Sequence, residues 1–95
     1  MKVFKTKQFD KNFQKYVRSD GDKEKFIQAL LILTDGRKLP KNEYHDHQLL
    51  HQRNGVRDFH LASDLVVVYY RIIEDRIEFL DVGPHSKVFK KFRKF

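Results

Sequence analysis

The chain has 95 residues, of which 40% are hydrophobic and 14% aromatic, with 20 Lys and Arg against 13 Asp and Glu and no Cys. This composition predicts a single folded domain over residues 1–95 and excludes a disordered chain, a disulfide-stapled fold and a thiolate metal site. The net charge of +7 favours an anionic partner such as a nucleic acid, although solubility alone would also account for it.

The N-terminal third predicts one strand followed by two helices. Residues 2–5 alternate like a short strand, and apolar residues at helical spacing predict helices over residues 7–18 and 23–34. Asp22 is expected to cap the second helix, and Gly36 suits the left-handed residue that ends it.

Beyond a polar loop at residues 37–44, which we expect to be exposed, the pattern changes to that of strands. Asn54-Gly55 is a predicted turn before a strand at residues 56–61, and Glu74-Asp75 is a predicted turn between strands at residues 65–73 and 76–82. Residues 86–95 form a short tail in which cations alternate with Phe. The predicted fold is α+β, with two N-terminal helices packed on a small antiparallel sheet.

The sequence also favours a cytoplasmic protein. The absence of Cys fits a reducing compartment, and no long apolar stretch follows the first residues as it would in a secretory signal. The longest apolar run, residues 65–70, is too short to span a bilayer.

Ionisable side chains gather in the C-terminal half. In a strand over residues 56–61, Asp58 and His60 share one face, while Arg57, Phe59 and Leu61 share the other. A carboxylate beside an imidazole would orient it and make it more basic, which favours acid–base chemistry, although a solvated strand face gives the same pattern.

Other histidines have weaker support when each is taken alone. His85 follows a predicted strand and a Gly-Pro turn, a position where functional residues are common. His45 and His47 are two residues apart in a polar segment, but no third ligand stands at a recognised metal-binding spacing, so we predict no metal and no other cofactor. His51 has no evident role.

Taken together, these segments resemble the YafQ branch of the RelE-like toxins, the mRNA endonucleases of bacterial type II toxin–antitoxin modules. The resemblance spans nearly the whole chain and is carried by Asp46-His47-x-Leu49, Gly55-Val56-Arg57-Asp58-Phe59-His60, Ser63-Asp64, Val67-Val68-Tyr69 and Gly83-Pro84-His85-Ser86-Lys87-Val88-Phe89. The chain departs from the family at Leu65, where an aromatic residue can occur, at residues 50–54, and in the basic tail after Phe89.

The resemblance implies a twisted antiparallel sheet and a metal-independent ribonuclease that acts on mRNA, with the ribosome as the expected context. It implies a catalytic set of His47, His60, Asp64 and His85, supported by Asp58, with substrate bound by Phe89. We add Arg57 as a supporting charge, and Lys87, Lys90 and Lys91 as substrate-binding residues. Cations mixed with aromatic rings often hold single-stranded RNA, although a frayed terminus docked on the sheet gives the same pattern.

The division of labour within that set is a hypothesis. We assign the general acid to His85, and the base and phosphate contacts to His47 and His60, tuned by Asp64 and Asp58. Which of His47 and His60 is the base stays open. Arg57 lies on the opposite strand face, so its charge is a weak candidate for transition-state stabilisation.

The resemblance also implies a protein partner, a small antitoxin of the DinJ or RelB type with an acidic toxin-binding segment. Three alternatives stay open: a ribonuclease that acts on free RNA, a ParE-like gyrase-directed toxin without nuclease activity, and a degenerate toxin that only binds antitoxin. The histidine set argues against the last two, because neither needs acid–base groups.

Overall fold

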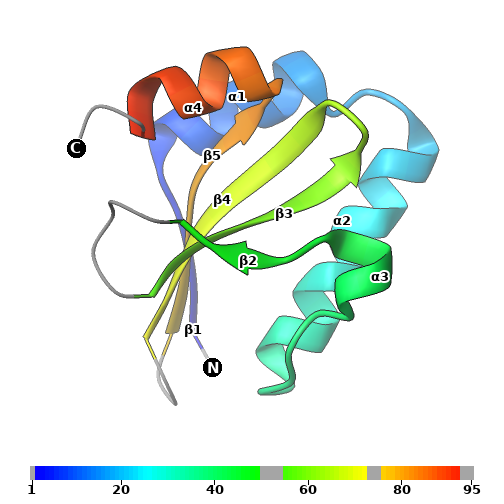
Figure 1. The fold of residues 1–95 in the computed structure, drawn as a ribbon, viewed down its shortest axis with the longest axis vertical. Coiled ribbons are helices and arrows are strands. Elements are labelled where there is room, and N and C mark those ends of the chain that lie inside the picture. The colour runs from blue at the N-terminus through cyan, green and yellow to red at the C-terminus, as the bar shows by residue number, and fades with distance from the viewer. Residues whose placement is uncertain (1, 50–54, 73–75, 93–95) are drawn as a thin grey trace.

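The computed structural model describes residues 2–49, 55–72 and 76–92, apart from the side chains of residues 71, 72 and 90–92. Its elements follow one another as β1 (Lys2–Lys5), α1 (Lys7–Tyr16), α2 (Asp20–Thr34), α3 (Lys41–Tyr44), β2 (His47–Gln48), β3 (Val56–Ala62), β4 (Leu65–Ile72), β5 (Arg76–Gly83) and α4 (His85–Phe92). The predicted α+β class is confirmed (Figure 1).

The strands form one sheet in the order β1-β5-β4-β3-β2. The pairs β3–β4 and β4–β5 are antiparallel as predicted, and the short strand β2, which was not predicted, pairs antiparallel with β3. In contrast, β1 pairs with β5 in parallel, so the sheet is mixed. The prediction of a wholly antiparallel sheet was wrong in this respect. Helices α1, α2 and α3 connect β1 at one edge of the sheet to β2 at the other edge. Because no short hairpin joins β1 to its partner β5, the direction of β1 is not set by a turn, and the two strands can pair in parallel.

Short polar side chains start the first two helices. Thr6 accepts a hydrogen bond from the Phe9 amide at 2.9 Å, and Ser19 accepts one from the Asp22 amide at 3.1 Å. Asp22 therefore lies in the first turn of α2 and is not its cap, which corrects the prediction. Gly36 has φ of 78°, as expected for the residue that ends this helix.

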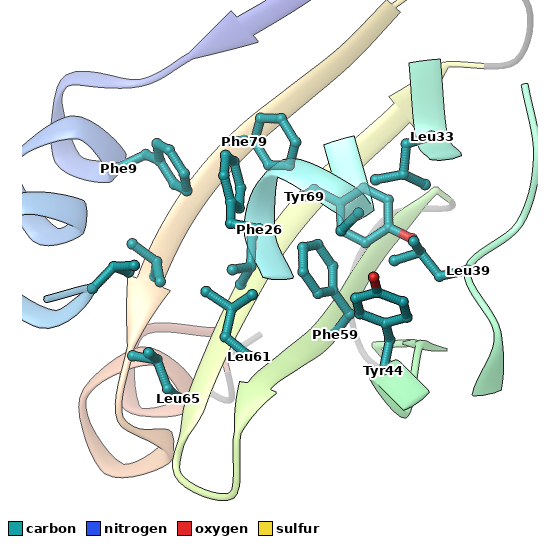
Figure 2. Close-up of a cluster of buried hydrophobic side chains, with 14 of the residues drawn as sticks. Phe9, Phe26, Leu33, Leu39, Tyr44, Phe59, Leu61, Leu65, Tyr69 and Phe79 are labelled. Atoms are coloured by element: carbon teal, nitrogen blue, oxygen red, sulfur yellow. The ribbon is translucent and has the colours of Figure 1, made fainter. Parts of the chain in front are cut away.

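One face of the sheet and the helices α1 and α2 enclose the main core. Figure 2 shows the rings of this cluster, and those of Phe9, Phe26 and Phe79 lie with centroids 5.1–5.7 Å apart. Phe59 and Tyr69 continue the cluster along β3 and β4, both almost inaccessible to solvent. This aromatic core is the main apolar burial that holds the helices on the sheet.

Two segments differ from the prediction. The loop at residues 37–44 was expected to be exposed, but Leu39 and Tyr44 are buried, and Tyr44 packs edge-to-face on Phe59 at 5.8 Å between centroids. The C-terminal tail was not predicted as a helix, yet its first part belongs to α4, whose Val88 is buried against Val56, Val66 and Val68 of the sheet.

Some predictions lie outside the described residues, namely Asn54 of the first turn and the Glu74-Asp75 turn. Gly55 is described, and its φ of 95° fits a turn. Among the described residues, no helix is long and apolar enough to cross a membrane.

Candidate active site

The site lies on the sheet face opposite α1 and α2. As predicted, Phe59 and Leu61 point into the main core, while Asp58 and His60 point to the other face. A smaller apolar cluster covers part of that face, and its buried members are Val56, Val66, Val68 and Val88. The site therefore stands on an apolar floor that α4 helps to form.

Strand pairing places His47 beside Asp58. The two residues are direct partners in the β2–β3 register, and the His47 Nδ1 atom lies 3.2 Å from Asp58 Oδ1. The expected pairing of Asp58 with His60 was therefore wrong. Directly opposed residues on neighbouring strands have closer side chains than residues two apart on one strand.

A second contact sets the proton position on His47. Its Nδ1 atom lies 2.8 Å from the backbone carbonyl oxygen of His45. A carbonyl oxygen only accepts hydrogen bonds, so Nδ1 must carry the hydrogen and, in the neutral ring, Nε2 holds the free lone pair. His47 is exposed, so this lone pair is open to substrate.

Asp58 is an unusual buried carboxyl group. Its side chain is fully buried, and neither oxygen has a hydrogen-bond partner among the described residues. Burial raises its pKa to about 6, an effect that Asp46 reinforces and that the nearby His47 opposes. The interpretation of this strand face as simply solvated is therefore wrong for Asp58.

Asp64 binds His85 twice. Its Oδ1 atom lies 2.8 Å from His85 Nδ1 and accepts the His85 backbone N–H at 3.0 Å. Both bonds lower the pKa of Asp64. Because an ionised carboxylate only accepts, the ring carries hydrogen on Nδ1 and presents Nε2 outward. Asp64 had been expected to act on the base side, and the structure instead pairs it with the proposed acid.

Four rings form a row across the site. The centroids are 5.4 Å apart for His45 and His60, 4.9 Å for His60 and His85, and 5.2 Å for His85 and Phe89. Burial lowers the pKa of His60, and the neighbouring imidazoles lower it further. His60 is thus favoured in its neutral form at pH 7. We call these four residues the ring row.

His45 was not predicted to belong to the site, yet it ends the ring row. Its left-handed backbone, with φ of 51°, follows α3 and turns the chain toward β2. The alternation of His45 and His47 around a buried Asp46 was the available signal, but it indicated only metal binding.

Arg57 lies on the opposite face of the sheet, where it binds Asp46. Its Nη2 atom lies 3.1 Å from Asp46 Oδ2, and the Tyr69 hydroxyl donates to Asp46 Oδ1 at 2.7 Å. Asp46 is 6% exposed, so this network anchors the segment that carries His45 and His47. The geometry places Arg57 away from the ring row, as its strand position predicted.

The remaining predicted residues are only partly placed. Lys87 is exposed on α4, while the side chains of Lys90 and Lys91 lie outside the described residues. Within the described part of the chain, His, Asp and Glu side chains form no group of three positioned to hold a metal ion.

The chain matches a family model over residues 1–90, described as the bacterial toxin of a type II toxin–antitoxin system, YafQ. The chain belongs to the YafQ toxin family. The resemblance stated from the sequence is thereby confirmed, together with membership of the type II toxins.

Individual relatives agree with the family. A Haemophilus influenzae protein named "Putative toxin YafQ" is 36% identical over 66 residues, which cover 66% of this chain and 64% of that protein. The match therefore spans slightly less than two thirds of this relative's length.

Solved structures show the same fold. A metal-bound toxin from Helicobacter pylori superposes with a TM-score of 0.80 at 27% identity, covering 94% of this chain and 99% of that one. The Escherichia coli YafQ chain in complex with DinJ gives a TM-score of 0.70 at 29% identity, with coverage of 92% and 96%.

Proposed function

We propose that this toxin is an endoribonuclease that cleaves mRNA, in the context of the ribosome, by histidine acid–base catalysis without a metal ion. The observation that carries the proposal is the pair of carboxylate–imidazole contacts, Asp58 with His47 and Asp64 with His85, on the two sides of His60. In each contact Nδ1 lies beside a carboxyl group, and Nε2 is left for the substrate.

The register across the sheet orders these groups. His47 stands on β2 opposite Asp58, and His60 lies further along β3, opposite Val66 of β4. His85 begins α4 and contacts the His60 ring from the other side. A phosphodiester lying over His60 would therefore have one imidazole on each flank, as in-line displacement at phosphorus requires.

In the proposed reaction His47 is the general base. Its Nε2 lone pair takes the proton of a ribose 2′-hydroxyl while the 2′-oxygen forms a bond to the adjacent phosphorus. The imidazolium that results lies against the buried carboxyl group of Asp58, and the ionised form of that group stabilises it.

His85 is the proposed general acid. His85 acts in its imidazolium form: its Nε2–H protonates the 5′-oxygen as the bond from phosphorus to that oxygen breaks, while its Nδ1–H stays bonded to Asp64 and the ring is left neutral. The products are a 2′,3′-cyclic phosphate, which can open to a 3′-phosphate, and a 5′-hydroxyl. A positioned acid or base contributes about 10²–10⁴-fold each.

Other residues bind the substrate. Neutral His60 donates a hydrogen bond to a non-bridging phosphate oxygen, and Phe89 stacks on a base. Phe89 is half-buried against the apolar floor, so its ring is held in place for stacking. The exposed cation of Lys87 attracts the RNA backbone, and we assign the same role to Lys90 and Lys91.

A cognate DinJ-like antitoxin is the proposed protein partner. The similar E. coli YafQ forms a complex with DinJ. The net charge of +7 on this chain favours an antitoxin with an acidic toxin-binding segment, because opposite charges accelerate and orient association.

The decisive experiment incubates toxin that has been stripped with EDTA and desalted with end-labelled mRNA, with and without translating ribosomes, in a buffer whose only divalent cation is the Mg²⁺ that ribosomes need. We expect cleavage with ribosomes and 5′-hydroxyl products, and loss of cleavage in His85→Ala. Arg18→Ala is a matched control, since Arg18 is an exposed basic residue between α1 and α2. Cleavage by His85→Ala at the parental rate would contradict the acid assignment.

Two further results would contradict the proposed function and favour another one. Cleavage of free RNA without ribosomes would favour a ribosome-independent ribonuclease. Intact RNA together with inhibited DNA supercoiling by gyrase, measured with the same preparation, would favour a gyrase-directed toxin. Cleavage that is lost when the toxin is stripped with EDTA before the assay, and restored by adding a transition-metal ion, would overturn the metal-independent mechanism.

A further inference from the structure

A hollow of about 700 Å³ opens beside the ring row, at the end away from Phe89. Its volume lies within the range of small-molecule sites. The proposed catalytic steps use His47 and His60, but they assign no function to the space itself. The residues that line it and carry the argument are Lys25, Glu43, His45, His47, His60 and Ser63.

The backbone conformation of His45 places its side chain in the wall of this hollow. The left-handed φ of 51° places its exposed ring against His60, at 5.4 Å between centroids. Its carbonyl oxygen meanwhile holds His47 Nδ1 at 2.8 Å. The backbone of His45 thus orients a catalytic ring, and its side chain is left free to form a wall.

Lys25 supplies positive charge from α2. Its Nζ atom lies 5.2 Å from the centroid of the buried Tyr44 ring, a cation–π contact that restrains an otherwise flexible side chain. Glu43 also lines the hollow. Its carboxylate can accept hydrogen bonds from the amino groups of adenine, cytosine or guanine.

We infer that the hollow binds the nucleotide adjoining the scissile phosphate on the side opposite the one stacked on Phe89, with His45 against its base and Lys25 at its phosphate. This inference rests on the proposed ribonuclease function and identifies a second substrate subsite. His45 and Phe89 end the ring row on its two sides, so each would contact a different base.

Single-stranded RNA is the ligand that suits this chemistry. Stacking rings next to a cation are the usual means of holding unpaired nucleotides, because every base has a π-face and every linkage carries a negative charge. Three imidazoles and an ammonium group meet that description within one hollow.

The test pairs protein variants with modified RNA. The cut site is first mapped with unmodified RNA, and binding is then measured with 2′-O-methyl RNA, which cannot be cleaved through its 2′-oxygen. An abasic residue is placed on either side of the cut site. His45→Asn is the main variant, because Asn tolerates a left-handed backbone and retains the carbonyl that holds His47.

We expect the abasic residue at the hollow position to weaken binding to the wild type by about 5- to 100-fold. In His45→Asn this penalty should largely disappear, while the abasic residue on the other side should keep its full effect. Phe89→Ala should show the reverse pattern, which makes the two variants matched controls for each other.

Lys25→Gln should weaken binding of the intact RNA and reduce its salt dependence by about one phosphate contact. Lys7→Gln is the control for charge, since Lys7 is exposed at the start of α1 and does not line the hollow. Circular dichroism of each variant verifies the fold.

An unchanged abasic penalty in folded His45→Asn would overturn the subsite while leaving the proposed nuclease intact. A wild type that cuts no RNA, with or without ribosomes, would overturn both. Equal losses in Lys25→Gln and Lys7→Gln would show a diffuse charge effect and would remove Lys25 from the subsite.

Discussion

One carboxylate oxygen, Oδ1 of Asp64, receives both the backbone N–H of His85 at 3.0 Å and its Nδ1 at 2.8 Å. The first bond satisfies an amide at the start of α4, and the second fixes the direction of the ring. The β3–β4 turn and the start of the last helix are thereby joined, although they are separated by the whole of β4 and β5 in sequence.

Asp64→Ala should impair cleavage more than it impairs folding. Asp64 is exposed, so its loss has little effect on packing, but the His85 ring loses the acceptor that sets its tautomer. We expect the cleavage rate to fall about tenfold to hundredfold, a part of what a positioned acid contributes. Asp35→Ala removes another exposed carboxylate, paired with Arg37, and should cleave like the wild type.

Asp58→Asn should stabilise the protein at neutral pH while reducing cleavage. The folded-state pKa of about 6 lies above the ordinary 3.8, so the folded protein loses stability from this group as pH rises between those values. Removing the charge should therefore raise the free energy of unfolding by about 1–3 kcal/mol at pH 8, and by less at pH 5.

Urea unfolding of Asp58→Asn at both pH values measures this effect. Asp81 provides a matched control, because it is also buried but accepts hydrogen bonds from Asn12 at 2.7 Å and from the Val82 amide at 2.8 Å. Asp81→Asn should destabilise the fold. If Asp58→Asn were equally destabilising at pH 8, Asp58 would not be an uncompensated buried charge.

His47→Ala and His60→Ala should differ in the pH dependence of cleavage. If His47 is the base, its removal abolishes the acidic limb of the pH–rate profile, because no group then needs to lose a proton. His60→Ala should lower the rate at every pH and keep that limb. Single-turnover cleavage between pH 5 and 8 distinguishes the two, and the opposite pattern would transfer the base role to His60.

Tyr69→Phe should lower the free energy of unfolding by about 1.5–3 kcal/mol, since buried Asp46 loses a hydrogen bond of 2.7 Å. The bonds from Arg57 remain, so the segment with His45 and His47 should keep its position. Thermal unfolding and cleavage assays test this together. A large loss of cleavage in a protein that remains folded would show that the network directly supports catalysis.

Val88→Ala should loosen α4 from the sheet. Val88 is 1% exposed in the cluster beneath the site, and we expect a loss of about 1–3 kcal/mol in unfolding free energy. Cleavage should fall with it, because α4 carries His85 and Phe89. Val3→Ala, at a residue 39% exposed on β1, is the matched substitution and should change stability by less than about 0.5 kcal/mol.

Local sequence patterns predicted the main elements well. Alternation and helical spacing report which face of an element is buried, and this is why Asp58 and His60 could be placed opposite Phe59. Short-range patterns did not predict the C-terminal helix, because the burial of its Val88 depends on a sheet face formed by residues distant in sequence. They failed also at Leu39 and Tyr44, which are buried by contacts distant in sequence.

Residue types and their order were thus enough to identify the toxin family, the sheet face and the candidate histidines, because these depend on periodicity and motif spacing. Which carboxyl group pairs with which histidine depends instead on the strand register and on where the end of β5 positions α4. Only the folded chain pairs His47 with Asp58 and His85 with Asp64, and only there does His45 join the ring row. Distances between side chains on different strands are set by long-range packing, which no local pattern contains.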